Sequence, residues 1–330
     1  MRGGNALLSL AKKGNRRFEY RNPQVLRNRV VNAVVWVLRW VFILALSYLF
    51  VYPLLFLVST SLMDPSSVND PSVVLVPKGL SFASIKEMAE LLGYWDAALL
   101  TLSISVFSTL AALVSCSLVG YSLSRFTFPG KGLLFMLVVL TIIVPPQTIL
   151  PSMALNFQFF DFGGLLSLLP GENSTINLMN TVWTFVLPSL FATGLRSGVF
   201  IFIFRQFFQG LPVDLEEAAR IDGCGAFRTY VQIIVPLAVP AFITVTLFSF
   251  VWHWNDLYSS SMYFTTDVRP LMVLLSDLEE LLNRSFGTTQ YAVRAYKAAA
   301  PLLTIIPPLI LYLFTQKYFT ESIERSGIVG

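Results

Sequence analysis

The chain has 330 residues, of which 55% are hydrophobic and 13% are charged, with a formal net charge of +4. Its mean hydropathy is +0.67. Its charged fraction lies well below that of soluble domains, in which roughly a quarter of the residues are charged. This balance excludes an ordinary soluble enzyme and is typical of a membrane protein. Two cysteines and one histidine are too few for a disulfide framework, a metal site or Ser-His-Asp catalysis.

The first 32 residues form a basic stretch that precedes the first long apolar block. Because no small-residue cleavage site follows this block, we expect it to remain as a membrane anchor rather than to be removed as a signal peptide. A basic stretch also suits nucleic acid, but beside an anchor its expected partner is the anionic surface of the lipid bilayer. We therefore predict a cytoplasmic tail over 1–32, no nucleic-acid partner, and a membrane domain over 33–330.

Six apolar segments reach the length of about 20 residues that a helix needs to cross a bilayer. They cover residues 33–62, 97–121, 132–155, 181–204, 237–258 and 298–319. Most lysines and arginines between the segments fall on the side of the N-terminal tail, which places both termini in the cytoplasm. The sequence thus predicts an all-α, multi-pass membrane protein with six transmembrane helices. Prolines in the third and fourth segments predict kinks.

The loop over 210–236 begins with a short predicted helix. Asp214 can accept the first free backbone N–H groups, and Glu217, three residues later, can complete a capping box. Ala218 and Ala219 follow, and alanine is the strongest helix former.

A turn and a second helix complete this loop. Gly223 and Gly225 permit a sharp turn, because glycine adopts the left-handed conformation that ends helices. An amphipathic helix is then predicted over 226–235, ended by Pro236. Such an exposed pair of helices is either a docking element for another protein or a connector that folds back on the membrane bundle.

The spacing of this loop resembles that of one transporter family. The run Glu217-Ala218-Ala219, followed by Gly223 and then by Ile233 and Pro236, resembles the EAA loop of the permeases of ATP-binding-cassette (ABC) importers. Val235 stands where that family usually has leucine. Segments 121–130, 248–256 and 316–330 are similar to its carbohydrate branch, and residues 95–320 resemble its transmembrane domain.

The resemblance implies the type I importer permease fold, with six transmembrane helices and a cytoplasmic coupling helix, in a bacterial cell membrane. The implied solute is a sugar or oligosaccharide. The implied partners are two cytoplasmic ATP-binding subunits, a second homologous permease and an extracytoplasmic solute-binding protein. The implied coupling residues are Glu217, Ala218, Ala219, Asp222, Gly223, Ile233 and Pro236. The sequence contains no Gly-x-x-x-x-Gly-Lys-Ser/Thr run, so we expect ATP to bind to the partners and this chain to be a transport subunit without a cofactor.

Candidate residues of a solute pathway gather at the end of the fifth segment. Trp252 and Trp254 offer flat faces to sugar rings, and Asn255 and Asp256 can exchange hydrogen bonds with hydroxyl groups. The alternative for the aromatic residues is an interfacial belt at the level of the lipid headgroups. Arg196, predicted to lie inside the fourth segment, faces either the pathway or a structural partner, because an unpaired charge is costly at that depth. His253 beside them is interpreted as a structural hydrogen-bonding residue.

Other functions remain open at this point. A permease of the same superfamily could carry a phosphate ester, a peptide or an amino acid, although Arg196 is the only basic residue evident for an anionic solute. An ion-driven secondary transporter would need several intramembrane carboxylates, and an intramembrane enzyme would need converging catalytic groups. Asp256 is the one acid evident near the membrane segments.

Overall fold

The computed structural model describes residues 23–64, 67–68, 70, 76–164, 175–286 and 293–326. Over these residues the secondary structure is helical, and extended pairing is limited to two isolated bridges, Met63 with Leu80 and Phe160 with Ile176. The prediction of an all-α protein is therefore confirmed. The chain divides into two compact units, Met1–Ser59 and Thr60–Gly330.

The first unit is dominated by one long helix, α2 (Pro23–Ser61). From Val30 onward it is apolar and long enough to cross a membrane, as predicted for the first segment. Its apolar side chains are exposed along nearly the whole length, which suits a helix surrounded by lipid. The predicted boundary between residues 32 and 33 lies inside this helix, and residues 1–22 of the predicted tail lie outside the described residues.

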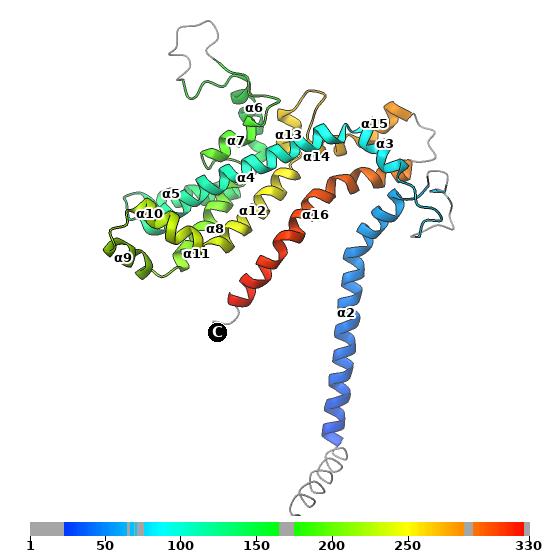
Figure 1. Ribbon diagram of the computed structural model, residues 1–330, viewed down its shortest axis with the longest axis horizontal. Helices are drawn as coiled ribbons and strands as arrows, with labels where there is room; N and C mark the ends of the chain where they lie inside the picture. The colour runs from blue at the N-terminus through cyan, green and yellow to red at the C-terminus, as the bar shows by residue number, and fades with distance from the viewer. Residues whose placement is uncertain are drawn as a thin grey trace, which may run out of the picture. The chain divides into compact units, whose positions relative to one another are not determined.

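The second unit is a bundle arranged around the helix α4 (Figure 1). Its elements are α3 (Ala83–Leu91), α4 (Tyr94–Arg125), α5 (Lys131–Ile143), η1 (Pro146–Thr148), α6 (Leu150–Gln158), α7 (Trp183–Leu190), α8 (Ser197–Gly210), α9 (Asp214–Ile221), α10 (Ala226–Thr229), the π-helix η3 (Tyr230–Ile234), α11 (Val235–Leu237), α12 (Val239–Trp254), α13 (Tyr258–Tyr263), α14 (Leu271–Ser276), α15 (Leu278–Phe286) and α16 (Val293–Ser326).

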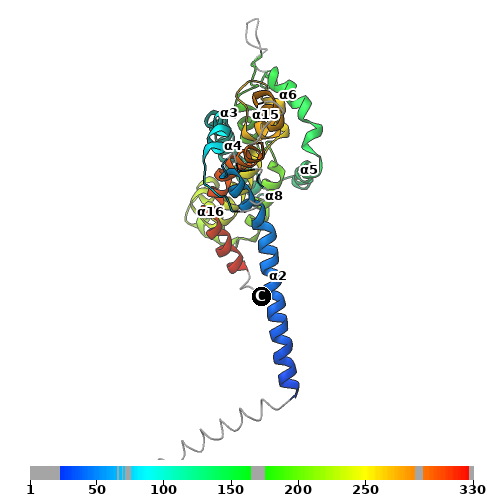
Figure 2. The same cartoon turned by 90° about the vertical axis from the view of Figure 1, so that its right-hand side faces the viewer.

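Small residues let neighbouring helices approach α4 closely. Its buried positions are mostly alanine, serine, threonine and glycine, the residue types that drive packing where lipid removes the hydrophobic difference between helices. A Cβ atom at Gly120 would lie 2.7 Å from Cβ of Phe204 on α8. α7, α8 and α12 all pack on α4. The view in Figure 2 separates α5 and α6, on the right, from α3 and α16 on the left.

The third and fourth predicted segments are not continuous helices, which corrects the prediction. The third is divided at Pro145 and Pro146 into α5, the single turn η1 and α6. The fourth is divided into α7 and α8 by residues 191–196. Proline explains the first break, because Pro145 and Pro146 have no backbone N–H to continue α5. α7 instead continues past Pro188 to Leu190 and is followed by the left-handed residue Ala192, with a φ of +56°. The carbonyl of Pro188 accepts the N–H of Thr193 at 2.9 Å, a hydrogen bond that closes the end of α7.

The remaining predicted segments correspond to helices with shifted ends. The second lies within α4 and the sixth lies within α16, whereas the fifth ends at Trp254 rather than at Tyr258. Among the described residues, three helices are long and apolar enough to cross a membrane, and up to five spans result if each of two sharply bent helix pairs counts as one. The predicted number of six spans stays a prediction.

Candidate functional site

The loop between α8 and α12 folds as two short helices joined by a tight turn, as its sequence predicts. α9 ends at Ile221, and the N–H of Gly223 donates to the carbonyl of Arg220 at 3.0 Å. Gly223 has a φ of +80°, the left-handed conformation in which glycine carries no steric cost. Gly225 is extended, with a φ of −71°, so the left-handed turn forms at Gly223 and not at Gly225.

One predicted detail of this loop is wrong. Asp214 is the first residue of α9, and Val213 precedes it without a side-chain capping bond, so no capping box with Glu217 forms. The acidic first turn still suits the positive end of the helix dipole. Pro236 is the second-to-last residue of the continuous helical stretch Ala226–Leu237, so the predicted end of the second helix is confirmed to within one or two residues. The chain bends by 78° two residues later, at Ala238.

The implied coupling residues divide between two faces of this loop. Glu217, Ala218, Asp222, Gly223 and Pro236 are exposed, Ile233 is half-buried and Ala219 is buried. Ile221 and Phe227 of this loop are also exposed, over 86% and 73% of their area, and neither is among the site residues predicted from the sequence. Exposed large apolar side chains on a loop are typical of a protein-binding surface, so the docking role predicted for this loop stays a prediction. The sequence feature that could have predicted the exposure of Ile221 is its position on the polar side of an amphipathic helix.

The other face of α9 is fastened to α4 by a buried ion pair. Nε of Arg125 lies 2.7 Å from Oε1 of Glu216, and both side chains are almost fully buried. The hydroxyl of Tyr121 donates to Oε2 of Glu216 at 3.2 Å. Neither residue of this pair is among the site residues predicted from the sequence. Two sequence features could have predicted this pair. One is an acid on the face of α9 that faces the bundle, and the other is an arginine at the end of an apolar segment.

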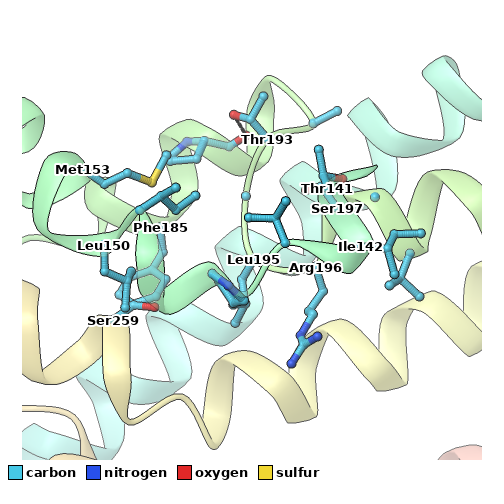
Figure 3. Close-up of a pocket in the computed structure, with 18 of the residues that line it drawn as sticks. Thr141, Ile142, Leu150, Met153, Phe185, Thr193, Leu195, Arg196, Ser197 and Ser259 are labelled. Carbon is cyan, nitrogen blue, oxygen red and sulfur yellow. Dashed lines mark hydrogen bonds between the residues drawn. The ribbon is translucent and has the colours of Figure 1, made fainter. Parts of the chain in front are cut away.

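A cavity of about 460 Å³ lies among α5, α6, α7, α8 and α13. Its wall is mostly apolar, and Figure 3 shows Met153, Leu150 and Phe185 on one side of the α7–α8 connection and Ile142 on the other. Five hydroxyl-bearing residues of these helices interrupt the apolar wall, namely Thr141, Thr184, Ser197, Ser259 and Tyr263. This combination of size, apolar wall and a few polar groups suits a small organic ligand.

Arg196 lies at the edge of this cavity and not inside a helix, which corrects its predicted place. It precedes the first residue of α8 with a φ of +58°, a left-handed conformation that is costly for any residue with a Cβ atom. Its guanidinium carbon lies 5.5 Å from the centroid of the Trp252 ring, a cation–π contact. In Figure 3 the side chain extends from the α7–α8 connection toward α12. The structure thus brings together Arg196 and Trp252, two of the predicted pathway residues.

The other predicted pathway residues lie apart from Arg196. Trp254 is buried in the bundle core, and Asn255 is exposed at the end of α12. Asp256 caps α13, because its carboxylate accepts the Ser260 N–H at 2.8 Å and the Ser259 hydroxyl at 3.1 Å. Since Ser259 lines the cavity, Asp256 is one hydrogen bond away from it. A solute role for these residues stays a prediction.

His253 occupies a structural position. It is buried, and its Nδ1 lies 2.7 Å from the carbonyl oxygen of Ser249, so this ring nitrogen carries the proton and donates it. The edge of its ring packs near Phe185, with the ring centroids 6.1 Å apart.

Helices of transmembrane length and two sharply bent helix pairs define the chain as an all-α membrane protein over the described residues. Comparison with known families agrees, because residues 116–325 match the family described as "Binding-protein-dependent transport system inner membrane component". The chain belongs to this family.

Individual relatives are permeases of transport systems. The chain is 31% identical over 239 residues to the osmoprotective compounds uptake permease protein GgtD of Synechocystis sp., covering 72% of this chain and 71% of the relative. It is 24% identical to the polygalacturonan/rhamnogalacturonan transport system permease protein YtcP of Bacillus subtilis, over 92% of this chain and all of the relative. A solved bacterial ABC transporter that imports the acidic polysaccharide alginate has a similar fold, with a TM-score of 0.68, 23% identity, and coverage of 89% of this chain and 98% of that chain.

Proposed function

We propose that this chain is a membrane-spanning permease subunit of an ABC importer and that it moves a sugar or oligosaccharide into the cell. An extracytoplasmic binding protein delivers the solute, a second homologous permease completes the pathway, and two cytoplasmic subunits bind and hydrolyse ATP. Both termini of the chain are cytoplasmic in this arrangement. The chain forms part of the solute pathway and changes conformation during transport. Its partner subunits catalyse ATP hydrolysis.

The observation that carries this proposal is the exposed face of α9. Four exposed residues share one side of the helix, because they form two adjacent pairs that are four residues apart, namely Glu217, Ala218, Ile221 and Asp222. This side combines two carboxylates with an apolar side chain and small residues, which lets another protein approach the helix closely. A short helix of this kind that protrudes from a membrane bundle can act as a coupling helix, because a cytoplasmic partner bound to it can move the bundle.

The solute class rests on the cavity and on the relatives. The cavity offers an apolar wall with several hydroxyl groups. Trp252 lies beside Arg196 but outside the lining, and its ring packs on Phe200 and Phe248. Three relatives carry polygalacturonan/rhamnogalacturonan, arabinooligosaccharide and alpha-glucoside transport in their names, and the first of these solutes is acidic. Arg196 is the one cation among the lining residues, which favours a neutral solute over a polyanion.

The test is reconstitution of the purified assembly. The tagged chain is isolated from its native membrane, the proteins that co-purify are identified, and the assembly is placed in vesicles with ATP on the side of α9. Uptake is then measured with labelled neutral oligosaccharides, an oligogalacturonate and an amino acid. The variant Glu217→Ala is compared with Glu280→Ala, which removes a carboxylate from an exposed pair on α15.

Recovery of an ATPase and a binding protein, with uptake of a neutral oligosaccharide that requires ATP, supports the proposal. We expect Glu217→Ala to lose ATP-driven uptake and Glu280→Ala to keep it. Uptake of the oligogalacturonate alone, or of the amino acid alone, would contradict the proposal that the solute is a neutral sugar. Transport without ATP, or a chain that purifies without an ATPase, would overturn the importer itself.

A further inference from the structure

Three residues on one side of α4 hold the whole loop that contains α9 and α10. Ser117, Tyr121 and Arg125 are spaced four residues apart, so they form a single stripe along the last turns of the helix. This is the end of α4 beside which α9 and α10 lie in Figure 1. We call these three residues the α4 stripe. Each of them contacts a residue of the loop between α8 and α12.

The first contact of the α4 stripe is with α9 and with the chain that enters it. Arg125 pairs with Glu216 through Nε, and its second terminal nitrogen donates to the carbonyl of Leu211 at 2.7 Å. One guanidinium therefore holds both the connector after α8 and the first turn of α9. Tyr121 adds a hydrogen bond to the other carboxylate oxygen of Glu216. The two oxygens of Glu216 are thus engaged by two different side chains of α4.

The second contact is with the π-helix η3. The hydroxyl of Tyr230 lies 2.7 Å from the hydroxyl of Ser117, and the rings of Tyr230 and Tyr121 have centroids 5.0 Å apart. A π-helical turn inserts an extra residue into the helix and so rotates the following side chains, and such turns are frequent at functional sites. Here the turn begins at Tyr230, the residue that reaches α4. The loop is therefore fastened to α4 on both sides of the turn at Gly223.

The fastened side and the open side of α9 are different faces of the same short helix. Glu216 and Ala219 are buried toward the bundle, whereas Glu217, Ala218 and Ile221 are exposed. A force applied to the exposed face therefore reaches α4 through a buried ion pair and hydroxyl hydrogen bonds, in addition to the short connector 211–213 that joins α9 to α8. A buried ion pair adds little net stability, but removal of one partner leaves an uncompensated charge, so this pair opposes separation of α9 from α4.

We propose that Arg125 and Glu216 are positioning residues that lock the loop onto α4, so that α4 and α9 move as one body when the ATP-binding subunits move α9. This inference rests on the proposed function, because it describes how an ATPase movement would enter the bundle. It assigns α4, and not α8 or α12, as the helix that receives the movement first. α7, α8 and α12 then follow because they pack on α4.

The first test uses the complete importer in vesicles with its binding protein. Glu216→Gln keeps the size of the side chain and removes the charge, and Glu280→Gln makes the same change in an exposed pair on α15. Assembly is measured by co-purification of the ATPase, and coupling is measured as solute transported per ATP hydrolysed. We expect Glu216→Gln to co-purify the ATPase as the unaltered chain does, with transport per ATP lowered roughly tenfold, within the usual range of coupling between sites. Unaltered transport per ATP would overturn the proposal.

The second test measures the movement directly and covers the case in which Glu216→Gln fails to assemble. Spin labels are placed at Ser122 on α4 and Arg220 on α9 in a Cys224→Ser background, and a second pair joins Arg220 to Tyr312 on α16. We expect the α4–α9 distance to stay the same with and without trapped ATP while the α9–α16 distance shifts. A change in the α4–α9 distance as large as the α9–α16 change would overturn the proposal. An unaltered chain that transports nothing with ATP would instead overturn the proposed function.

Discussion

The indole nitrogen of Trp254 on α12 donates a hydrogen bond to the backbone carbonyl of Thr304 on α16 at a distance of 3.0 Å. This bond uses the one donor of the tryptophan inside the bundle. The ring is 1% exposed and stacks on Phe250 with a centroid distance of 5.7 Å. Trp254 therefore joins α12 to the last helix, and its two neighbours Trp252 and Asn255 remain the more open members of the same cluster.

The first prediction concerns this bond. Trp254→Phe leaves the carbonyl of Thr304 buried without its donor and opens space beside α16, so we expect the free energy of unfolding to fall by about 2–4 kcal/mol. Trp95→Phe is the matched control, because Trp95 is 75% exposed on α4. Thermal unfolding in detergent, followed by loss of the monodisperse protein, measures both variants. Equal melting temperatures for the two variants would contradict a structural role for Trp254.

The sequence predicts much of this fold because lipid imposes a simple rule. Apolar segments of sufficient length become helices, and residues 97–121 and 298–319 do so within α4 and α16. The loop over 210–236 is also predictable, since Gly223 must supply a left-handed turn between two amphipathic stretches. These features depend on local composition and spacing, which are visible in a single sequence.

The features that escaped prediction depend on which side chains meet. Hydropathy treats residues 181–204 as one span, but α7 ends at Leu190, and the left-handed residues Ala192 and Arg196 separate it from α8. Glu216 and Glu217 are adjacent acids in the sequence. One is buried against Arg125 and the other is exposed, and this difference depends on the way α9 lies on α4.

The second prediction concerns the close approach of α4 and α8. A methyl group at Gly120 would lie 2.7 Å from Cβ of Phe204 and 3.1 Å from the backbone nitrogen of Arg205, so Gly120→Ala must push the two helices apart. We expect a loss of about 1–3 kcal/mol in the free energy of unfolding, as for other overpacked interiors. Gly132→Ala is the control, because no atom lies within 4 Å of its Cβ position. Thermal unfolding should separate the two, with Gly132→Ala at least as stable as the unaltered chain.

The third prediction tests the turn of the coupling loop. Gly223→Ala places a Cβ atom in the left-handed region, at a cost of roughly 1–2 kcal/mol that favours a different turn. Gly225→Ala adds the same methyl group at an extended residue that also has open space around it. We expect Gly223→Ala to reduce the amount of ATPase that co-purifies and Gly225→Ala to leave it near the original level. Equal losses in both variants would point to direct contact by the methyl groups and not to the turn conformation.

The fourth prediction separates the backbone of the α7–α8 connection from the side chain of Arg196. Arg196 and Ala192 both have left-handed φ angles, +58° and +56°, so glycine at either position relieves strain of roughly 1–2 kcal/mol. Arg196→Gly also loses the cation–π contact with Trp252, worth about 0.5–2 kcal/mol, and we expect its stability to change little. Ala192→Gly loses a single methyl group and is expected to be at least as stable as the unaltered chain.

Transport gives the decisive difference between these two variants. If the guanidinium beside the cavity contacts the solute, Arg196→Gly lowers uptake in vesicles even though the protein folds and assembles, whereas Ala192→Gly transports normally. Uptake as a function of solute concentration, together with the melting temperature of each variant, makes this comparison. Normal uptake by Arg196→Gly would assign Arg196 to the packing of α8 against α12 and would remove it from the solute pathway. A residue retained in a strained backbone conformation at no gain in stability is expected at a functional site, and these two glycine variants measure whether Arg196 is such a residue.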